Sequence, residues 1–171
     1  ALPSPEKLPS TGTYCAFSPD DKVLVVGCGA GEIVFLDVKQ GLECLATIRA
    51  FASKRGELTR VDLCQTDERV YVAASCTKSG LNFACVYDIT NPRNPTLVTQ
   101  LPHPGPTSSV RFAPDAALLA TTCSDDTVRL WDTHTWRLVR EIAMEGSYDA
   151  RTWSVSFVPN VSGMLLVPNA T

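Results

Sequence analysis

The stretch that decides the fold is HPGPTSSVRFAPDAALLATTCSDDTVRLWD, residues 103–132. Apolar and β-branched side chains gather there in short runs, and in the first run they alternate with polar ones, which is typical of strands. Proline and aspartate, which favour turns, separate the runs at 114–115 and 124–126. The stretch therefore predicts three successive strands: 108–113, 117–123 and 127–131.

The same pattern recurs along the chain. The residues near the ends of the successive first strands are Phe17, Leu63, Phe112 and Phe157. Their spacing of roughly 45 residues, with room for four strands in each unit, is typical of proteins built from repeated antiparallel sheets. We expect an extended lead-in over 1–12, then units at 13–49, 58–101 and 107–143, and part of another at 152–171.

The third unit resembles a repeat of the WD-repeat β-propeller family. The resemblance runs from His103 through an F-x-P-D turn at 112–115 and a D-x-T-V turn at 125–128 to Trp-Asp at 131–132. It implies an all-β fold, an incomplete WD-type propeller of three four-stranded antiparallel blades and part of a fourth. A blade that is apolar on both faces needs a neighbour on each side, so we expect sheets from outside residues 1–171 to complete the ring.

The resemblance also implies a buried hydrogen-bond network in the third unit, made of His103, Thr121, Asp125 and Trp131. A neutral imidazole can bridge a carboxylate and a hydroxyl, and a buried indole N–H needs an acceptor. We expect this network to be structural rather than catalytic. The other units depart from the pattern, with Leu36 and Tyr87 in the position of the tryptophan.

Composition argues against several classes of function. The net charge is −3 and no run of basic residues exceeds Lys54-Arg55, so direct nucleic-acid binding is not expected. No apolar run approaches the roughly 20 residues of a membrane helix. The seven cysteines are odd in number and lack C-x-x-C spacing, which favours buried thiols over disulfides or a zinc site and indicates an intracellular chain, cytoplasmic or nuclear. We expect no cofactor and no metal.

One motif supports a different reading. Residues 23–32, VLVVGCGAGE, are similar to the cofactor loop of S-adenosylmethionine-dependent methyltransferases. That alternative predicts a helix starting near Gly31, whereas the β-branched residues 32–37 favour a strand after a tight hairpin. A second alternative is an RNA-associated propeller in a ribonucleoprotein, which the acidic net charge disfavours.

The sequence therefore favours a binding function. We expect a non-enzymatic protein–protein interaction scaffold in a multiprotein assembly, with other protein chains as partners. Arg93 and Trp136 lie in predicted turns, and Arg137 begins the strand expected after Trp136. These three residues are the first candidates for a contact patch, because tryptophan and arginine dominate interface energetics. The alternative for Trp136 is that its ring folds back onto its own hairpin.

Overall fold

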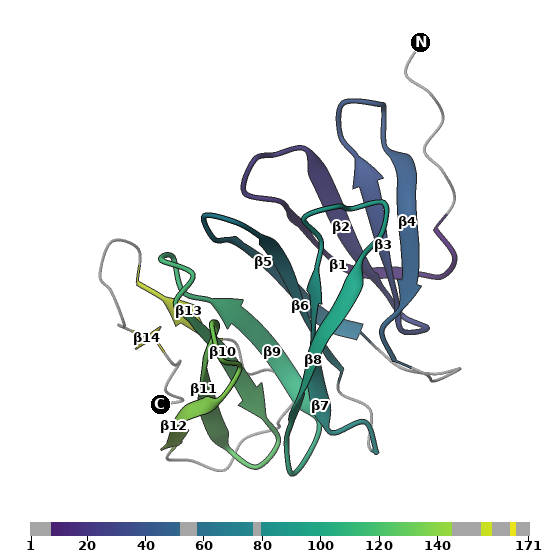
Figure 1. Ribbon diagram of the computed structural model, residues 1–171. Helices are drawn as coiled ribbons and strands as arrows, with labels where there is room; N and C mark the ends of the chain where they lie inside the picture. The colour runs from purple at the N-terminus through teal and green to yellow at the C-terminus, as the bar shows by residue number, and fades with distance from the viewer. Residues whose placement is uncertain (1–7, 52–57, 77–79, 145–154, 159–164, 167–171) are drawn as a thin grey trace.

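The computed structural model describes residues 8–51, 58–76, 80–144, 155–158 and 165–166, which form strands and turns but no helix (Figure 1). The first sheet consists of β1 (Gly12–Phe17), β2 (Val23–Cys28), β3 (Glu32–Asp37) and β4 (Glu43–Arg49). The second consists of β5 (Leu58–Gln65), β6 (Val70–Cys76), β7 (Phe83–Asp88) and β8 (Thr96–Pro102). The third consists of β9 (Thr107–Phe112), β10 (Leu118–Cys123), β11 (Thr127–Asp132) and β12 (Leu138–Ala143). A strand pair follows, β13 (Ser156–Phe157) with β14 (Leu165–Leu166).

Within each four-stranded sheet the strands pair antiparallel and in chain order. The predicted all-β fold of four-stranded antiparallel sheets is confirmed. β1 begins at Gly12, inside the expected lead-in, and residues 1–7 lie outside the described ranges. Of the expected unit at 152–171, only the short strands β13 and β14 and two residues beside β13 are described.

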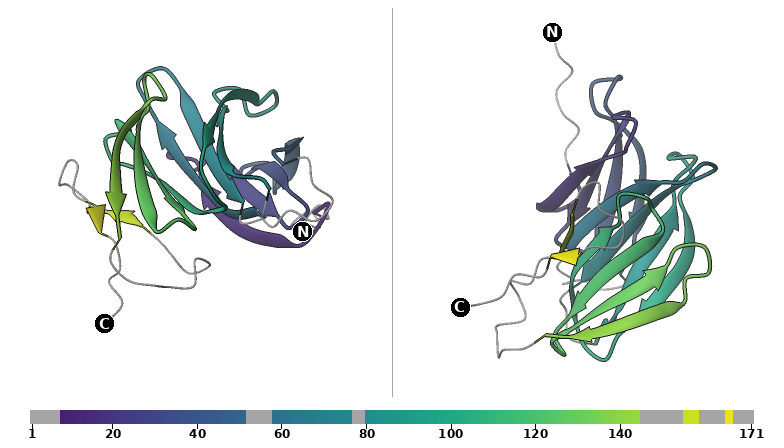
Figure 2. Two further views of the ribbon diagram at one scale, coloured as in Figure 1. Left: turned by 90° about the horizontal axis from the view of Figure 1, so that it is seen from below. Right: turned by 90° about the vertical axis from the view of Figure 1, so that its left-hand side faces the viewer.

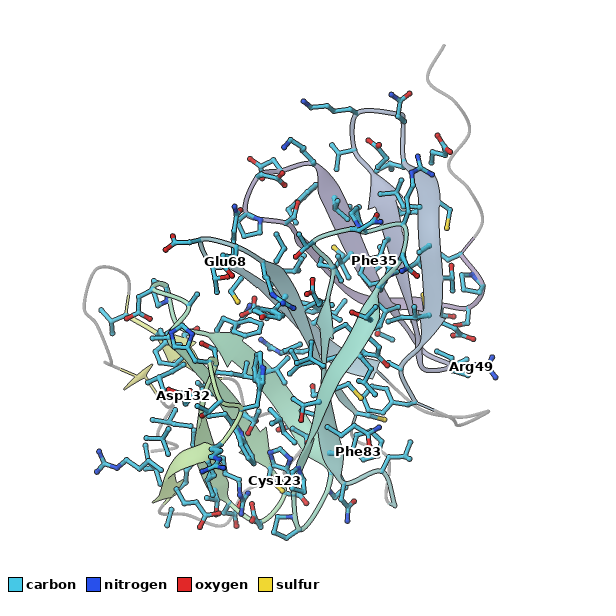
Figure 3. The ribbon with its side chains drawn as sticks, viewed as in Figure 1. Phe35, Arg49, Glu68, Phe83, Cys123 and Asp132 are labelled. Carbon is cyan, nitrogen blue, oxygen red and sulfur yellow. The ribbon has the colours of Figure 1, made fainter. Side chains whose placement is uncertain are left out.

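The three sheets repeat the same irregular details. The pairing of the third strand with the fourth shifts register at Phe35/Leu36, at Val86/Tyr87 and at Leu130/Trp131. Each third strand also ends at an aspartate whose carboxylate accepts a backbone N–H of the following turn, a local bond that favours chain reversal. These aspartates are Asp37, Asp88 and Asp132, the last of which is labelled in Figure 3. The sheets are therefore structural copies of one unit.

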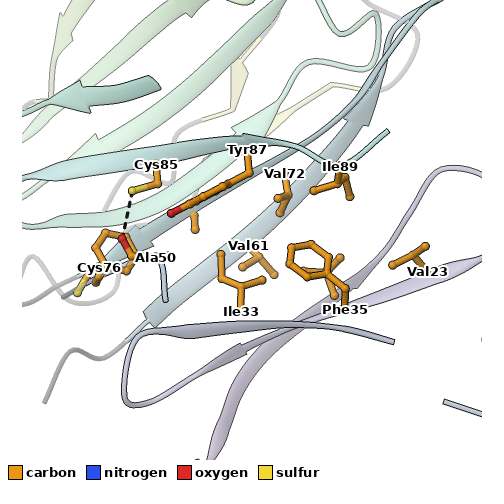
Figure 4. Packing of buried hydrophobic residues seen from close by; sticks show 13 residues of the cluster. Val23, Ile33, Phe35, Ala50, Val61, Val72, Cys76, Cys85, Tyr87 and Ile89 are labelled. Atoms are coloured by element: carbon orange, nitrogen blue, oxygen red, sulfur yellow. Dashed lines mark hydrogen bonds between the residues drawn. The ribbon is translucent and has the colours of Figure 1, made fainter. Parts of the chain in front are cut away.

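The sheets stack side by side through their first strands (Figure 2). β5 contacts β1 on one side and β9 on the other, and β9 also contacts β13. Between the first two sheets, Ile33 and Phe35 meet Val61, Val72 and Tyr87, as Figure 4 shows. A second cluster fills the space between the second and third sheets. The three sheets consequently lie in a row like the blades of an open fan, and β13 lies against the third sheet.

The glycine-rich segment is a hairpin turn, not the start of a helix. β3 begins at Glu32, directly after Gly31, whose φ is 90°. A Cβ at Gly31 would also lie 2.9 Å from the carbonyl oxygen of Phe51, so glycine is required there for its conformation and for its size. The structure therefore contradicts the helix that the methyltransferase alternative predicts near Gly31, because β3 occupies those residues. Nor does any described segment form a helix long and apolar enough to cross a bilayer.

Candidate functional site

His103 lies in the connection from β8 to β9, with its side chain buried. Its Nε2 lies 2.8 Å from Thr121 Oγ1, and its Nδ1 lies 2.8 Å from the carbonyl oxygen of Leu101. Trp131 donates its indole N–H to the same Thr121 oxygen at 2.9 Å. The hydroxyl can therefore donate to Nε2, and this bonding pattern assigns the proton of the neutral imidazole to Nδ1.

The environment of His103 keeps it uncharged. Burial lowers the pKa of His103 to about 4, and the nearby Arg129 guanidinium acts in the same direction. The backbone N–H of His103 donates to the carbonyl oxygen of Asn82, in the second sheet's loop before β7, at 2.9 Å. His103 thus connects the second sheet to Thr121 of the third, which is a structural task that a neutral, buried imidazole performs without titrating near neutral pH.

Asp125 belongs to a different cluster. Its two carboxylate oxygens accept from Arg129 Nη1 at 3.1 Å and Nη2 at 2.6 Å. Arg129 is buried and also donates from Nε to Glu141 at 2.8 Å. The partner expected for the His103 ring was the Asp125 carboxylate, but the Leu101 carbonyl oxygen takes that place. The physical reason is that a buried guanidinium needs a counter-charge more strongly than a neutral imidazole does.

A second polar network, which the sequence analysis did not identify, joins the first strands of all three sheets. Arg111 of β9 donates to Asp62 of β5 at 2.9 Å and to the Tyr14 hydroxyl of β1 at 3.0 Å. Arg60 lies over the Tyr14 ring, 5.3 Å from its centroid. Asp62 also accepts the backbone N–H of Phe112 at 2.7 Å. The sequence feature that could have predicted this network is the opposite charge of Asp62 and Arg111, which lie at corresponding positions of successive first strands.

Burial raises the pKa of the Asp62 carboxyl, while the Phe112 amide and the Arg111 guanidinium act to lower it. A pocket of about 390 Å³ adjoins this pair at the end of β5 and β9. Arg111 uses its two terminal nitrogens on Asp62 and Tyr14, so the guanidinium is occupied in holding the sheets together. The network therefore joins neighbouring sheets and leaves the guanidinium engaged within the protein.

Of the three residues expected to form a contact patch, the structure places Arg93 apart from Trp136 and Arg137. Trp136 packs edge-on against Tyr71 of the second sheet, with ring centroids 5.3 Å apart, instead of folding back onto its own hairpin. Arg93 lines a pocket of about 350 Å³ between the first and second sheets. Arg137 is exposed, and its carbonyl oxygen accepts the backbone N–H of Asp132. Arg93 and Trp136 therefore lie at different sheet junctions.

The described residues contain no cluster of three or more metal-binding side chains. Burial raises the pKa of Cys64 and of Cys85 to about 12, so both thiols stay protonated near neutral pH. A protonated thiol is a weak nucleophile, and these two cysteines act as small apolar core residues.

Comparison with protein-family models gives a match within the described sheets. The family model described as "WD domain, G-beta repeat" matches residues 94–132. The matched segment runs from β8 of the second sheet through β11 of the third, and includes His103, Thr121 and Trp131. No curated protein matches the sequence. WD40 repeats generally mediate protein–protein interactions, and their domains are typically scaffolds rather than enzymes. The matched repeat and the three four-stranded antiparallel sheets agree: the chain contains a WD40 repeat, and its all-β fold is that of an open, incomplete WD-type propeller.

Proposed function

We propose that the chain is a non-enzymatic scaffold subunit of a multiprotein assembly, in which further β-sheet from outside residues 1–171 covers the open side of the first sheet. The observation that carries this proposal is the exposure of Phe17, which is 55% exposed at the end of β1. In a protein whose sheets bury their faces against one another, a large apolar side chain left exposed on one sheet is a strong candidate for contact with a further sheet.

The internal repeat supports the choice of occupant. Phe112 has the same place at the end of β9 and is only 7% exposed, because the second sheet covers it. Two residues before Phe17, Cys15 is exposed. Val61 and Val110, at the corresponding positions of β5 and β9, are fully buried. The positions that are open in the first sheet are therefore those that a preceding sheet covers elsewhere in the molecule.

The partners that we propose are other protein chains, including one that supplies sheet. An intracellular setting agrees with the buried thiols, which a reducing compartment would preserve: Cys28, Cys64, Cys76, Cys85 and Cys123.

Affinity purification from cells tests the proposal. Phe17→Glu places a charge in the expected contact, so we expect it to remove the co-purifying proteins seen with the unmodified chain. Val139→Glu is the matched control, because Val139 is 60% exposed on the outer strand β12, away from the open side of the first sheet. Circular dichroism should show both variants folded. Equal recovery of partners with the two variants would contradict the proposal.

A further inference from the structure

We propose that the pocket between the first and second sheets binds an extended peptide segment in which an apolar side chain stands beside a carboxylate. The pocket holds about 350 Å³, within the usual range of roughly 300–1,000 Å³ for ligand sites, and lies between the β1–β2 turn and the β7–β8 turn. The inference rests on the proposed scaffold function and names the chemistry of a partner. It concerns a different surface from Phe17.

The floor of the pocket is apolar. Val23 and Ile89 are buried there, and Leu45 and Val70 are partly buried beside them. Val23 and Ile89 belong to the buried cluster that joins the two sheets, and Leu45 and Val70 pack against it, so the floor is held by the core and does not have to be assembled by a ligand. A preformed apolar surface of this kind accepts an aliphatic side chain with little ordering cost.

The acidic groups around the pocket are already engaged. The Asp20 carboxylate pairs with Lys22 at 2.8 Å and accepts from Ser18 at 2.7 Å. These bonds lower the pKa of Asp20 to about 2. Asp37 accepts the backbone N–H groups of Lys39 and Gln40. Neither carboxylate is therefore available as the main binding group for a cationic ligand.

Arg93 is the side chain that selects for charge. It is exposed at the pocket, and its guanidinium forms no ion pair with any residue that the structure describes. The turn that carries it is held by two local bonds, from Arg93 N to Asn91 Oδ1 at 3.2 Å and from Asn94 N to Asn91 O at 2.9 Å. A guanidinium carried by an ordered turn beside an apolar floor complements a carboxylate next to an aliphatic group.

The next sheet junction explains why this pocket is open. Val23 pairs with Asp37, and Tyr71 pairs with Asp88, so these two residues have the same place in the first and second sheets. Trp136, from the β11–β12 turn of the following sheet, packs on Tyr71. The corresponding β7–β8 turn is longer, and residues 89–95 contain no aromatic side chain to cover Val23. The space that an indole fills at one junction is left free at the other.

A methyl NMR titration of the full chain tests the inference. The probe is the hexapeptide Gly-Ser-Leu-Glu-Ser-Gly, with its glutamate replaced by glutamine in one control and its leucine by serine in another. We expect the methyl signals of Val23, Leu45, Val70 and Ile89 to shift with a dissociation constant of roughly 1 mM or below, while those of Val128 stay fixed. Both control peptides should bind more weakly. The absence of shifts at the four floor residues would overturn the inference.

Reversing the charge of Arg93 tests whether its guanidinium binds the carboxylate of the probe peptide. Arg93→Glu should weaken binding of the probe about tenfold or more, because it sets like charges against each other. Arg137→Glu changes an exposed arginine in the corresponding turn of the third sheet and should leave binding unchanged. Equal binding by wild type and Arg93→Glu would refute the pairing.

Phe17→Glu separates the two proposals. It should retain the peptide while losing the assembly partners. Loss of peptide binding alone would therefore remove this inference and leave the scaffold proposal standing.

Discussion

Thr121 is the residue on which the buried network of the third sheet depends, since its hydroxyl meets both His103 and Trp131. Thr121→Val keeps the shape of the side chain but leaves two buried ring nitrogens without their partner. We expect the free energy of unfolding to fall by about 2–4 kcal/mol, because each unsatisfied buried group carries its full desolvation penalty. Urea unfolding near neutral pH measures the change.

Thr96→Val is the matched control for that substitution. Thr96 is exposed at the start of β8, so its replacement should change the free energy of unfolding by no more than about 0.5 kcal/mol. If the two variants lost the same stability, the hydroxyl of Thr121 would have no special role.

His103 makes the stability of the fold depend on pH. Its pKa falls from 6.5 to about 4 on burial, so between these values the unfolded chain binds a proton that the folded chain does not. The contribution of His103 to the free energy of unfolding is therefore fully present above pH 6.5. It is lost as the pH falls toward 4, by roughly 3 kcal/mol.

The comparison with His103→Asn isolates this contribution. Acidification over the same range should destabilise wild type more than His103→Asn, and the exposed His134→Asn should retain the wild-type dependence. Chemical denaturation at a series of pH values gives the slopes. Parallel slopes for wild type and His103→Asn would show that the imidazole is not neutral in the folded state.

At this scale the structure places Thr121 between His103 and Trp131, while Asp125 binds Arg129. A sequence motif indicates which groups can form hydrogen bonds. It does not rank the acceptors that the fold brings within reach, and here a buried cation four residues away takes the carboxylate.

At the scale of elements, the β11–β12 turn combines backbone strain with packing. Trp136 has a φ of 55°, a left-handed conformation that glycine adopts without penalty, and its ring contacts Tyr71. Trp136→Ala loses the ring contact and keeps the strain, for an expected loss of about 2 kcal/mol. Trp136→Gly should be more stable than Trp136→Ala by about 1 kcal/mol, because it removes the strain.

Thermal unfolding of the two Trp136 variants checks this order. Alanine normally stabilises a chain relative to glycine, since glycine has more conformational freedom to lose. The usual order, with the alanine variant more stable, would mean that the turn does not require a left-handed residue.

The ion pair between β5 and β9 stabilises the junction of the second and third sheets. Arg111→Met leaves the partly buried Asp62 carboxylate without its counter-charge and should lower the free energy of unfolding by about 3 kcal/mol. Adding Asp62→Asn should recover part of this loss. Arg69→Met is the control, because the Arg69–Asp88 pair is more exposed and contributes about 1 kcal/mol at most.

Urea unfolding of wild type, Arg111→Met, Asp62→Asn and the double variant forms a double-mutant cycle, which gives the coupling energy between Asp62 and Arg111. The control Arg69→Met is measured in the same way. Additive losses for Asp62 and Arg111 would contradict a direct interaction between them.

The elements themselves were largely predictable. The strand expected over 32–37 has the bounds of β3, and those expected at 108–113, 117–123 and 127–131 differ from β9, β10 and β11 by one residue at one or both ends, because alternation and turn residues act over only a few positions. The register shifts at Leu36, Tyr87 and Trp131 were not predicted, since a bulge depends on how two strands pair.

At the scale of the whole molecule, stacking decides what each copy of the unit contributes to stability. Cys15, Val61 and Val110 have the same place in the first strands, but only the latter two are covered by a preceding sheet. Val61→Ala and Val110→Ala should each lower the free energy of unfolding by about 2 kcal/mol, from lost burial and a residual cavity. Cys15→Ala should change it by less than about 0.5 kcal/mol.

Denaturant unfolding of these three variants in the isolated chain measures the difference. A loss for Cys15→Ala as large as that for Val61→Ala would mean that the open side of the first sheet is already covered.

The amino-acid sequence by itself determined the strands, the turns and the four-stranded repeat, because alternation, proline, glycine and aspartate act locally. Only the tertiary structure decided that Arg111 reaches both Asp62 and Tyr14, that Trp136 covers Tyr71, and that Arg93 stands beside an open pocket. Those outcomes depend on contacts between sheets whose residues are far apart in the chain. Local preferences cannot specify such contacts until the stacking of the sheets brings the residues together.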